Sequence, residues 1–203
     1  YAGGIDAPPA TGYARRTMTD MPFDDLTRLD DDALLVLYAN GDPSAARVLT
    51  GRLAPKVHSH AWRLLGDQAE AEDVTQEALL RLWRIAPEWR TGEAKVTTWL
   101  YRVTANLATD RIRRRRGRNV DLDAIPEPED EQPGAADRMQ DTARAEALHA
   151  ALETLPDRQK QAVVLRHIEG LANPDIAEIM SIGVEAVESL VARGKRGLSA
   201  VLM

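Results

Sequence analysis

Residues 95–118 read KVTTWLYRVTANLATDRIRRRRGR, and the periodicity of this segment sets the architecture expected for the whole chain. Apolar side chains recur in it at steps of three and four residues, the spacing of one buried face of an α-helix. These side chains belong to Val96, Leu100, Val103 and Leu107. The segment is therefore predicted to be a helix with one face in a protein core and the other face turned outward.

The outward face of this predicted helix carries a second stripe, also at steps of three and four residues. We call it the polar stripe, and its members are Trp99, Arg102, Asn106, Asp110 and Arg113. An indole gives a base a plane to stack on, a carboxamide can read a base edge, and guanidinium groups bind phosphates. The helix ends with additional cations, which include Arg111 and Arg114. This pattern favours an unpaired nucleic-acid strand as the ligand, and a solvated amphipathic helix with a basic end remains the alternative.

Length and composition narrow the classes of protein. The chain has 203 residues, a formal net charge of −6 and no cysteine. Such a length suits one or two domains, and the lack of cysteine excludes disulfide bonds and thiolate metal sites. His58 and His60 form a close pair, but no third ligand accompanies them, so no metal site is expected. Without a long apolar run or a signal sequence, the protein is expected to be soluble and cytoplasmic.

Turn signals and changes in composition divide the sequence into four parts. Residues 1–24 are predicted to be a disordered extension, and residues 119–141, rich in proline and acidic residues, a flexible linker. Helical periodicity recurs without strand-like alternation in the remaining parts, at 25–118 and 142–203. The expected fold class is all-α, with two small helical domains joined by the acidic linker. Because many of the acidic residues lie in the linker, the negative net charge of the chain is compatible with a basic surface on the helical domains.

The predicted helices follow from the same periodicity and from the residues that start and stop helices. They lie near 33–39, 46–65, 68–86, 95–118, 143–154, 158–169, 175–180 and 184–196. The helix at 68–86 carries a stripe of mostly polar residues, which are Asp73, Gln76, Glu77, Leu80 and Arg84. From its chemistry alone, a solvated face with a Glu77–Arg81 pair is favoured over a docking face for a basic partner helix.

The last two predicted helices, joined by a tight turn at 181–183, have the pattern of a helix–turn–helix. Their apolar positions, with a small residue where the helices cross, are Ile176, Ala177, Met180, Ile182, Val187 and Leu190. In a major groove the second helix exposes Glu185, Glu188, Ser189 and Arg193, with Lys195 and Arg196 at its far end. The two glutamates repel phosphates, although a glutamate can accept a hydrogen bond from cytosine N4. An ordinary helical hairpin is the alternative.

Two stretches carry a resemblance to a known family: EDVTQEALLRLW at 72–83 and TWLYRVTAN at 98–106. They closely resemble conserved region 2 of the bacterial extracytoplasmic-function (ECF, group IV) sigma factors of the sigma-70 family. Leu155-Pro156 and the helix–turn–helix resemble region 4 of the same family. At a finer level the chain resembles the alphaproteobacterial sigma factors that respond to singlet oxygen and are held by a zinc-containing anti-sigma factor.

The resemblance implies a role for each set of residues. Asp73, Gln76, Glu77 and Leu80, here called the docking patch, match the face that docks on the clamp helices of the RNA polymerase β′ subunit. Trp99, Arg102, Asn106 and Asp110 match the surface that opens and reads the −10 promoter element, with the loop at 89–96 around a flipped base. Arg111, Arg113 and Arg114 would hold backbone phosphates. Region 4 positions that face the −35 element, here called the recognition set, are Arg166, Asn173, Glu185, Glu188, Ser189, Arg193, Lys195 and Arg196.

The implied function is that of a dissociable RNA polymerase subunit that directs promoter recognition and DNA melting and is released by stress from an anti-sigma factor. No catalytic constellation is present, so an enzyme is not expected, and no cofactor is expected on this chain, any zinc lying on the anti-sigma partner. The family often has Lys or Arg at the position of Glu188 and a polar residue at that of Leu190. Two alternatives stay open: a decoy that sequesters an anti-sigma factor, and a stand-alone helix–turn–helix regulator.

Overall fold

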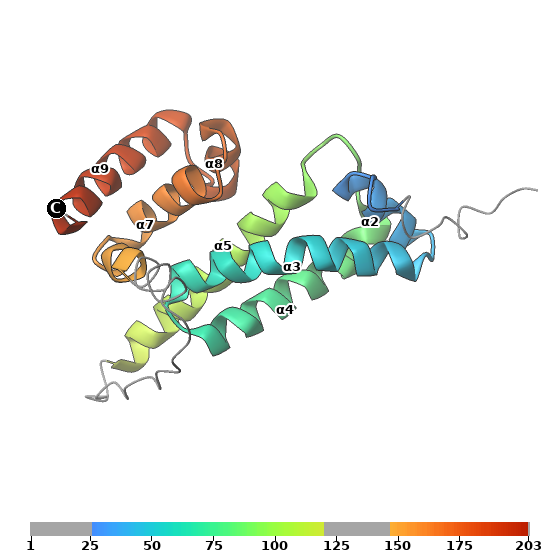
Figure 1. The fold of residues 1–203 in the computed structure, drawn as a ribbon, viewed down its shortest axis with the longest axis horizontal. Coiled ribbons are helices and arrows are strands. Elements are labelled where there is room, and N and C mark those ends of the chain that lie inside the picture. Colours follow the sequence, from blue (N-terminus) through green and yellow to red (C-terminus); the bar gives the residue numbers. More distant parts are fainter. Residues whose placement is uncertain (1–25, 120–146, 203) are drawn as a thin grey trace, which may run out of the picture.

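The computed structural model describes residues 26–119 and 147–202 of the chain. The predicted extension at 1–24 and nearly all of the predicted linker at 119–141 lie outside these ranges. Every regular element of the described ranges is helical, which confirms the all-α prediction. The elements form two units that lie against each other, coloured blue to yellow-green and orange to red in Figure 1.

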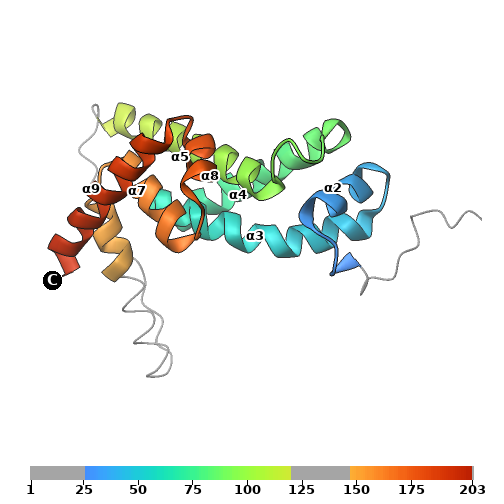
Figure 2. The ribbon, with the colours of Figure 1, turned by 90° about the horizontal axis from the view of Figure 1, so that it is seen from above.

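The first unit is built on three long helices that run side by side, with a shorter helix across one end (Figures 1 and 2). Its elements are α2 (Asp31–Ala39), α3 (Pro43–Leu65), α4 (Gln68–Ile85), η2 (Ala86–Glu88) and α5 (Val96–Asn119). Acidic residues cap the helix starts: the Asp30 carboxylate accepts from Ala33 N at 2.7 Å, and Asp67 accepts from Glu70 N at 2.8 Å. Gly66, at φ +70°, ends α3 in the left-handed conformation that glycine adopts without strain.

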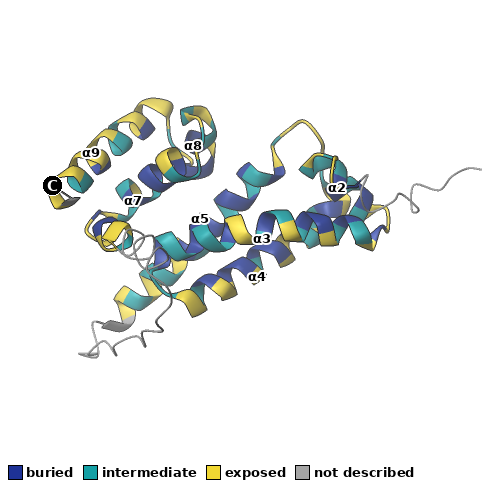
Figure 3. Ribbon diagram, viewed as in Figure 1, coloured by how far each residue is buried: buried dark blue, intermediate teal, exposed yellow. Residues whose placement is uncertain are grey.

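Helix α5 occupies the segment predicted at 95–118 to within one residue at each end. Val96 and Leu100 are buried, and Val103 and Leu107 pack partly buried against the core, as the periodicity predicts. Tyr101, which belongs to neither of the two predicted stripes, is also buried. Figure 3 shows α5 with buried residues along much of its length. The second unit accounts for this additional burial.

The second unit contains a helical segment at 147–153, α7 (Asp157–Val163), a π-helical turn η3 (Val164–Ile168), α8 (Asn173–Met180) and α9 (Val184–Leu202). The helix predicted at 158–169 is present as far as Ile168, but its second half is a π-helical turn and not an α-helix. There the backbone widens by one residue, and Glu169 N donates to Val164 O at 3.0 Å. Helix α9 also continues beyond its predicted end at 196.

Helices α8 and α9 form the predicted helix–turn–helix. Ser181, at φ 51°, makes the left-handed turn between them, and Ile182 N donates to Ala177 O at 3.0 Å. Ala177 and Val187 are buried in the core of the unit, and Leu190 packs against that core partly buried. Figure 2 shows α8 lying over α5, where the two units meet.

Two glycines within helices predict opposite effects on stability. A Cβ on Gly194 of α9 would lie 2.5 Å from Val163 Cγ2, whereas a Cβ on Gly51 of α3 would meet nothing within 4 Å. Gly194→Ala is therefore expected to lower the free energy of unfolding by about 1–2 kcal/mol through overpacking. Gly51→Ala should raise it by up to about 1 kcal/mol, because alanine is the better helix former. Thermal denaturation of both variants tests these two predictions. Equal changes in the melting temperature would contradict the close packing of α9 on α7.

His60 predicts how stability depends on pH. Its ring is fully buried, burial and then the charge of Arg63 lower its pKa to about 3, and its nitrogens have no hydrogen-bond partner among the described residues. Nδ1 lies 3.9 Å from Glu169 Oε1. The buried histidine stays neutral in the folded state, whereas in the unfolded state it takes up a proton near its ordinary pKa of 6.5. Its contribution to the free energy of unfolding is therefore complete above pH 6.5 and falls as the pH drops below that value.

The free energy of unfolding is therefore expected to fall by roughly 1 kcal/mol per pH unit between about pH 6 and pH 5. His60→Leu should lose this part of the slope, because it cannot bind the proton that the unfolded histidine takes up. Urea denaturation at a series of pH values measures it, with His58→Leu as the control two residues away. A slope that is identical in His60→Leu and the parent protein would contradict the assignment.

Candidate nucleic-acid interface

The polar stripe begins at an aromatic pair. Trp99 is half-buried against the core of the first unit, and its ring stands edge-to-face to Trp89 with centroids 6.3 Å apart. The indole N–H of Trp89 donates to Asp32 Oδ1 at 3.1 Å, so this ring is anchored to α2. Trp89 is the first residue of the loop at 89–96, and Trp99 lies just after the loop, in the first turn of α5. A half-buried indole that is held by a neighbour gives a fixed plane on which one base can stack.

Further along α5, the stripe approaches the second unit. Arg102 Nη1 lies 4.0 Å from Glu178 Oε1 of α8, a long and half-exposed ion pair. Asn106 is exposed, and so is Asp110, which lies 3.8 Å from Arg113 Nη1. The five members of the stripe therefore share one side of α5, as predicted, although the first two are partly covered.

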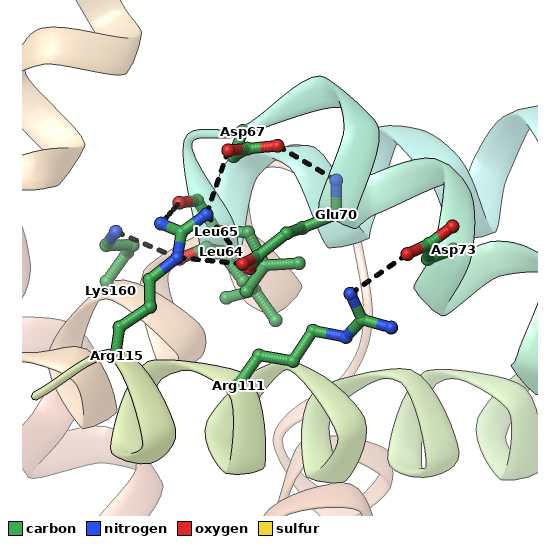
Figure 4. Close-up of polar contacts among 8 residues, drawn as sticks. All are labelled: Leu64, Leu65, Asp67, Glu70, Asp73, Arg111, Arg115 and Lys160. Carbon is green, nitrogen blue, oxygen red and sulfur yellow. Dashed lines mark hydrogen bonds and ion pairs between the residues drawn. The ribbon is translucent and has the colours of Figure 1, made fainter. Parts of the chain in front are cut away.

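The arginines at the end of α5 divide into two groups. Arg115 ties α5 to the α3–α4 turn: it donates to Leu65 O at 3.2 Å and to Glu70 Oε1 at 3.0 Å, and it ion-pairs with Asp67 Oδ2 at 3.0 Å (Figure 4). Arg111 Nη1 lies 3.3 Å from Asp73 Oδ2. Arg113 and Arg114 are exposed. The basic run is thus partly a structural tie between α5 and the α3–α4 turn, and its exposed members are the ones placed to bind phosphates.

Neighbouring arginines should therefore respond differently to truncation. Arg115→Ala is expected to lower the free energy of unfolding by about 1–2 kcal/mol, because it removes the side-chain donor of Leu65 O and of the Glu70 carboxylate and breaks the ion pair with Asp67. Arg114→Ala should leave stability unchanged and weaken binding to single-stranded DNA, and the slope of log affinity against log salt should fall by about 0.7 for each phosphate no longer bound. Thermal denaturation and salt-dependent titrations separate the two effects. Equal losses of stability would refute the division.

The docking patch lies on α4. Asp73 and Gln76 are exposed, and Glu77 is held by Arg81 Nε at 2.8 Å. This hydrogen bond holds the pKa of Glu77 below its ordinary value. Leu80, at 49% exposure, is the unusual member, since a large apolar side chain is open to solvent amid polar neighbours. The predicted Glu77–Arg81 pair is present, and beside it Leu80 offers an apolar anchor with a polar rim.

The docking patch and the end of α5 line one groove of about 410 Å³. The α4 wall consists of all four residues of the docking patch and Arg81, and the α5 wall consists of Leu107, Asp110, Arg111 and Arg114. The Arg111–Asp73 ion pair crosses between the two walls. Two sets of residues that the sequence assigned to separate roles therefore lie side by side on the first unit.

The recognition set is largely open to solvent on the second unit. Glu185, Glu188, Arg193, Lys195 and Arg196 are exposed along α9, and Ser189 is half-exposed. Before α9, Arg166 Nη1 donates to Leu171 O at 2.8 Å, and Asn173 Nδ2 lies 3.5 Å from Glu188 Oε1. Glu188 is thus placed to orient the Asn173 carboxamide. The sequence alone does not indicate this pairing.

Reasoning from the sequence did not single out Tyr101 or Lys160. Both are buried where the units meet. The burial of Lys160, of which only four per cent is exposed, is unusual because lysine is rarely buried. Within the described ranges, no group of three potential metal ligands comes together. No helix in those ranges is long and apolar enough to cross a membrane.

Comparisons with known proteins agree with this architecture of two helical units. Sigma-70 region 2 matches residues 49–118, and Sigma-70, region 4 matches residues 145–198. The chain is 33% identical to the ECF RNA polymerase sigma-E factor of Haemophilus influenzae, with 83% of this chain and 93% of that protein covered. It is 36% identical to the ECF sigma factor SigE of Mycolicibacterium smegmatis over 80% of this chain but only 65% of that protein. The chain belongs to the ECF sigma factors of the sigma-70 family, whose members are transcription initiation factors and not enzymes.

Solved structures share the fold. CnrH, in complex with the cytosolic domain of CnrY, matches with a TM-score of 0.64 at 22% identity, covering 85% of this chain and 96% of that one. The sigma factor RpoE from Bartonella quintana, in complex with the anti-sigma factor NepR, matches with a TM-score of 0.62 at 22% identity. That match covers 75% of this chain and 93% of the other.

Proposed function

We propose that this chain is a dissociable promoter-specificity subunit of RNA polymerase. In this proposal, the docking patch on α4 binds the clamp helices of the β′ subunit, and α9 places the recognition set in the major groove of a −35 element. The polar stripe of α5 then captures the bases of a −10 element as single strands. Unstacking a base costs a few kcal/mol, which the Trp99 plane and the loop beside it must offset.

The observation that carries this proposal is the shared groove of about 410 Å³ between α4 and α5. In the proposed function the chain opens DNA while it is bound to polymerase, and a docking surface next to the DNA surface suits that role. Here the Leu80 anchor and the exposed Arg114 cation line the same groove. Polymerase bound to α4 would therefore lie next to the groove and could contact the same melted strand.

We also propose that an anti-sigma factor restrains the chain, as in the complex of RpoE with NepR. In the finer form of this proposal, the partner carries zinc and its release answers singlet oxygen, as the sequence resemblance implies. The zinc ligands would then lie on the partner, because this chain supplies no cysteine.

Run-off transcription with purified core polymerase tests the proposal. A promoter-specific transcript is expected only when core enzyme and this chain are both present, and a metal-loaded anti-sigma partner should suppress it. An active core enzyme that yields no specific transcript would favour the decoy, to which the exposed Glu185 and Glu188 of α9 lend some support. Promoter binding without core polymerase, unaffected by changes in the docking patch, would favour a stand-alone regulator.

A further inference from the structure

We propose that Asp32 of α2 is a positioning residue for strand binding, which acts by holding the indole of Trp89. Through this indole it fixes the loop at 89–96 and the plane of Trp99. This role rests on the proposed function, because the −10 strand is the ligand that would stack on Trp99. It gives α2, which carries no member of the polar stripe or the docking patch, a part in the −10 interface.

Three consecutive aspartates at the start of α2 have three different partners. Asp30 caps the helix, and Asp31 Oδ1 accepts from Arg52 Nη1 of α3 at 2.7 Å. Asp32 is half-buried, and its Oδ1 accepts from Trp89 Nε1 at 3.1 Å. Because α2 also buries its apolar face in the core of the first unit, the carboxylate of Asp32 is a fixed point.

The loop at 89–96 is held at its two ends. At one end Val96 is buried as α5 begins, and at the other Trp89 is half-buried against the core. Most of the residues between them are exposed. Arg90 Nη1 lies 3.5 Å from Glu93 Oε1, an exposed ion pair that begins and ends within the loop. The hydrogen bond from the indole to α2 therefore sets where the loop starts and in which direction it leaves the core.

The plane of the Trp99 ring depends on the same indole. The backbone of α5 fixes where the side chain begins, but the terminal torsion of an indole is broad, so neighbouring groups select its value. The ring of Trp89 stands at 87° to that of Trp99, in the edge-to-face geometry that aromatic pairs favour. Both rings pack against one core. A carboxylate of α2 thus determines, through one indole, the angle of the surface on which a base would stack.

Charge alone predicts the opposite effect from positioning. A carboxylate near a strand-binding surface repels phosphates, so its removal should tighten binding. If Asp32 acts by holding Trp89, its removal should weaken binding, because the stacking plane is then in place for only part of the time. Asparagine separates the two effects, since it removes the charge and keeps an oxygen acceptor at the same position.

Titration of the full chain with a labelled single strand tests this role. The probe is an oligothymidylate about 12 nucleotides long, because stacking on an aromatic ring tolerates any base. We expect Asp32→Ala to bind it about five- to tenfold more weakly than the parent protein, and Asp32→Asn to bind it at least as tightly. Glu88→Ala removes an exposed carboxylate next to Trp89 and is the matched control, which should not weaken binding. Unchanged or tighter binding by Asp32→Ala would overturn the proposal.

Two further measurements distinguish positioning from a general loss of stability. Trp89→Phe keeps a ring but removes the indole N–H, so it should bind as weakly as Asp32→Ala, and the double variant should bind no more weakly than either. Since the chain has no cysteine, the exposed Thr91→Cys accepts a spin label in the loop. Well below the melting temperature, the label should move faster in Asp32→Ala and as in the parent protein in Asp32→Asn. Additive losses of affinity, or equal label motion in Asp32→Ala and the parent protein, would contradict the role of Asp32.

Trp99→Ala separates failure of this role from failure of the proposed function. Strand binding that is weakened in Trp99→Ala but normal in Asp32→Ala refutes the positioning role and leaves the polar stripe as the strand-binding surface. Normal strand binding in Trp99→Ala refutes the −10 contact of the proposed function, and the role of Asp32 falls with it.

Discussion

Replacing Leu80 by aspartate is expected to reduce binding to core RNA polymerase by about 30-fold or more, while the chain remains folded. An exposed leucine inside a rim of polar side chains is the usual form of an interface anchor, and truncation of such an anchor costs about 2 kcal/mol or more. A buried aspartate would add the cost of an unpaired charge in the interface. Because Leu80 is 49% exposed in the free chain, the folded state loses little by the change.

Co-elution and titration with purified core polymerase measure this effect. Glu72→Ala, exposed on the same helix but outside the docking patch, is the control and should bind normally. Gln76→Ala should show a smaller loss than Leu80→Asp, because it removes a polar group at the rim. Normal binding of Leu80→Asp would place the polymerase interface elsewhere on the chain.

The double substitution of Trp99 and Asn106 by alanine is expected to lower promoter-specific transcription about 100-fold without loss of polymerase binding. Stacking of one base on an aromatic ring is worth about 1–3 kcal/mol, and a well-placed amide contributes a similar amount to reading a base. Run-off transcription at saturating core enzyme measures the loss. Trp99→Phe keeps an aromatic plane and should retain most of the activity.

Controls separate this effect from a fault in folding. Trp99 is half-buried against the core, so the thermal midpoint of each variant must be recorded, whereas Asn106 is exposed and its truncation should not affect stability. Gln68→Ala removes an exposed amide from the start of α4 and should transcribe normally. Full transcription by Asn106→Ala and Trp99→Ala alike would exclude the polar stripe as the strand-binding surface.

Regular periodicity explains why so much of the fold was predictable. Helix α5 and the helix–turn–helix each repeat an apolar spacing over several turns, and aspartate caps mark the starts of α2, α3 and α4. The interruption after Val163 was not predictable, because a π-helical turn inserts one residue without altering the local composition. The prediction of a helix at 158–169 therefore did not include the change from α-helical to π-helical geometry.

The contact between the units was missed because it depends on pairs that are distant in sequence. Tyr101 belongs to neither stripe of the predicted helix, and the sequence does not indicate that Glu169, on the other unit, lies 2.7 Å from its hydroxyl. Lys160 reads as an exposed charge until Leu64 O accepts from it. In the same way, the run of arginines looks uniform in sequence, and only the positions of Asp67 and Glu70 separate Arg115 from its exposed neighbours.

Permanganate footprinting of promoter DNA tests the central claim most directly, because it detects thymines of the −10 element that have left the duplex. Holoenzyme formed with the parent chain is expected to make these thymines reactive. Holoenzyme formed with the Trp99→Ala, Asn106→Ala chain should bind core enzyme equally well and leave them protected. Equal reactivity with both chains would contradict the assignment of the α5 polar stripe as the surface that captures the melted strand.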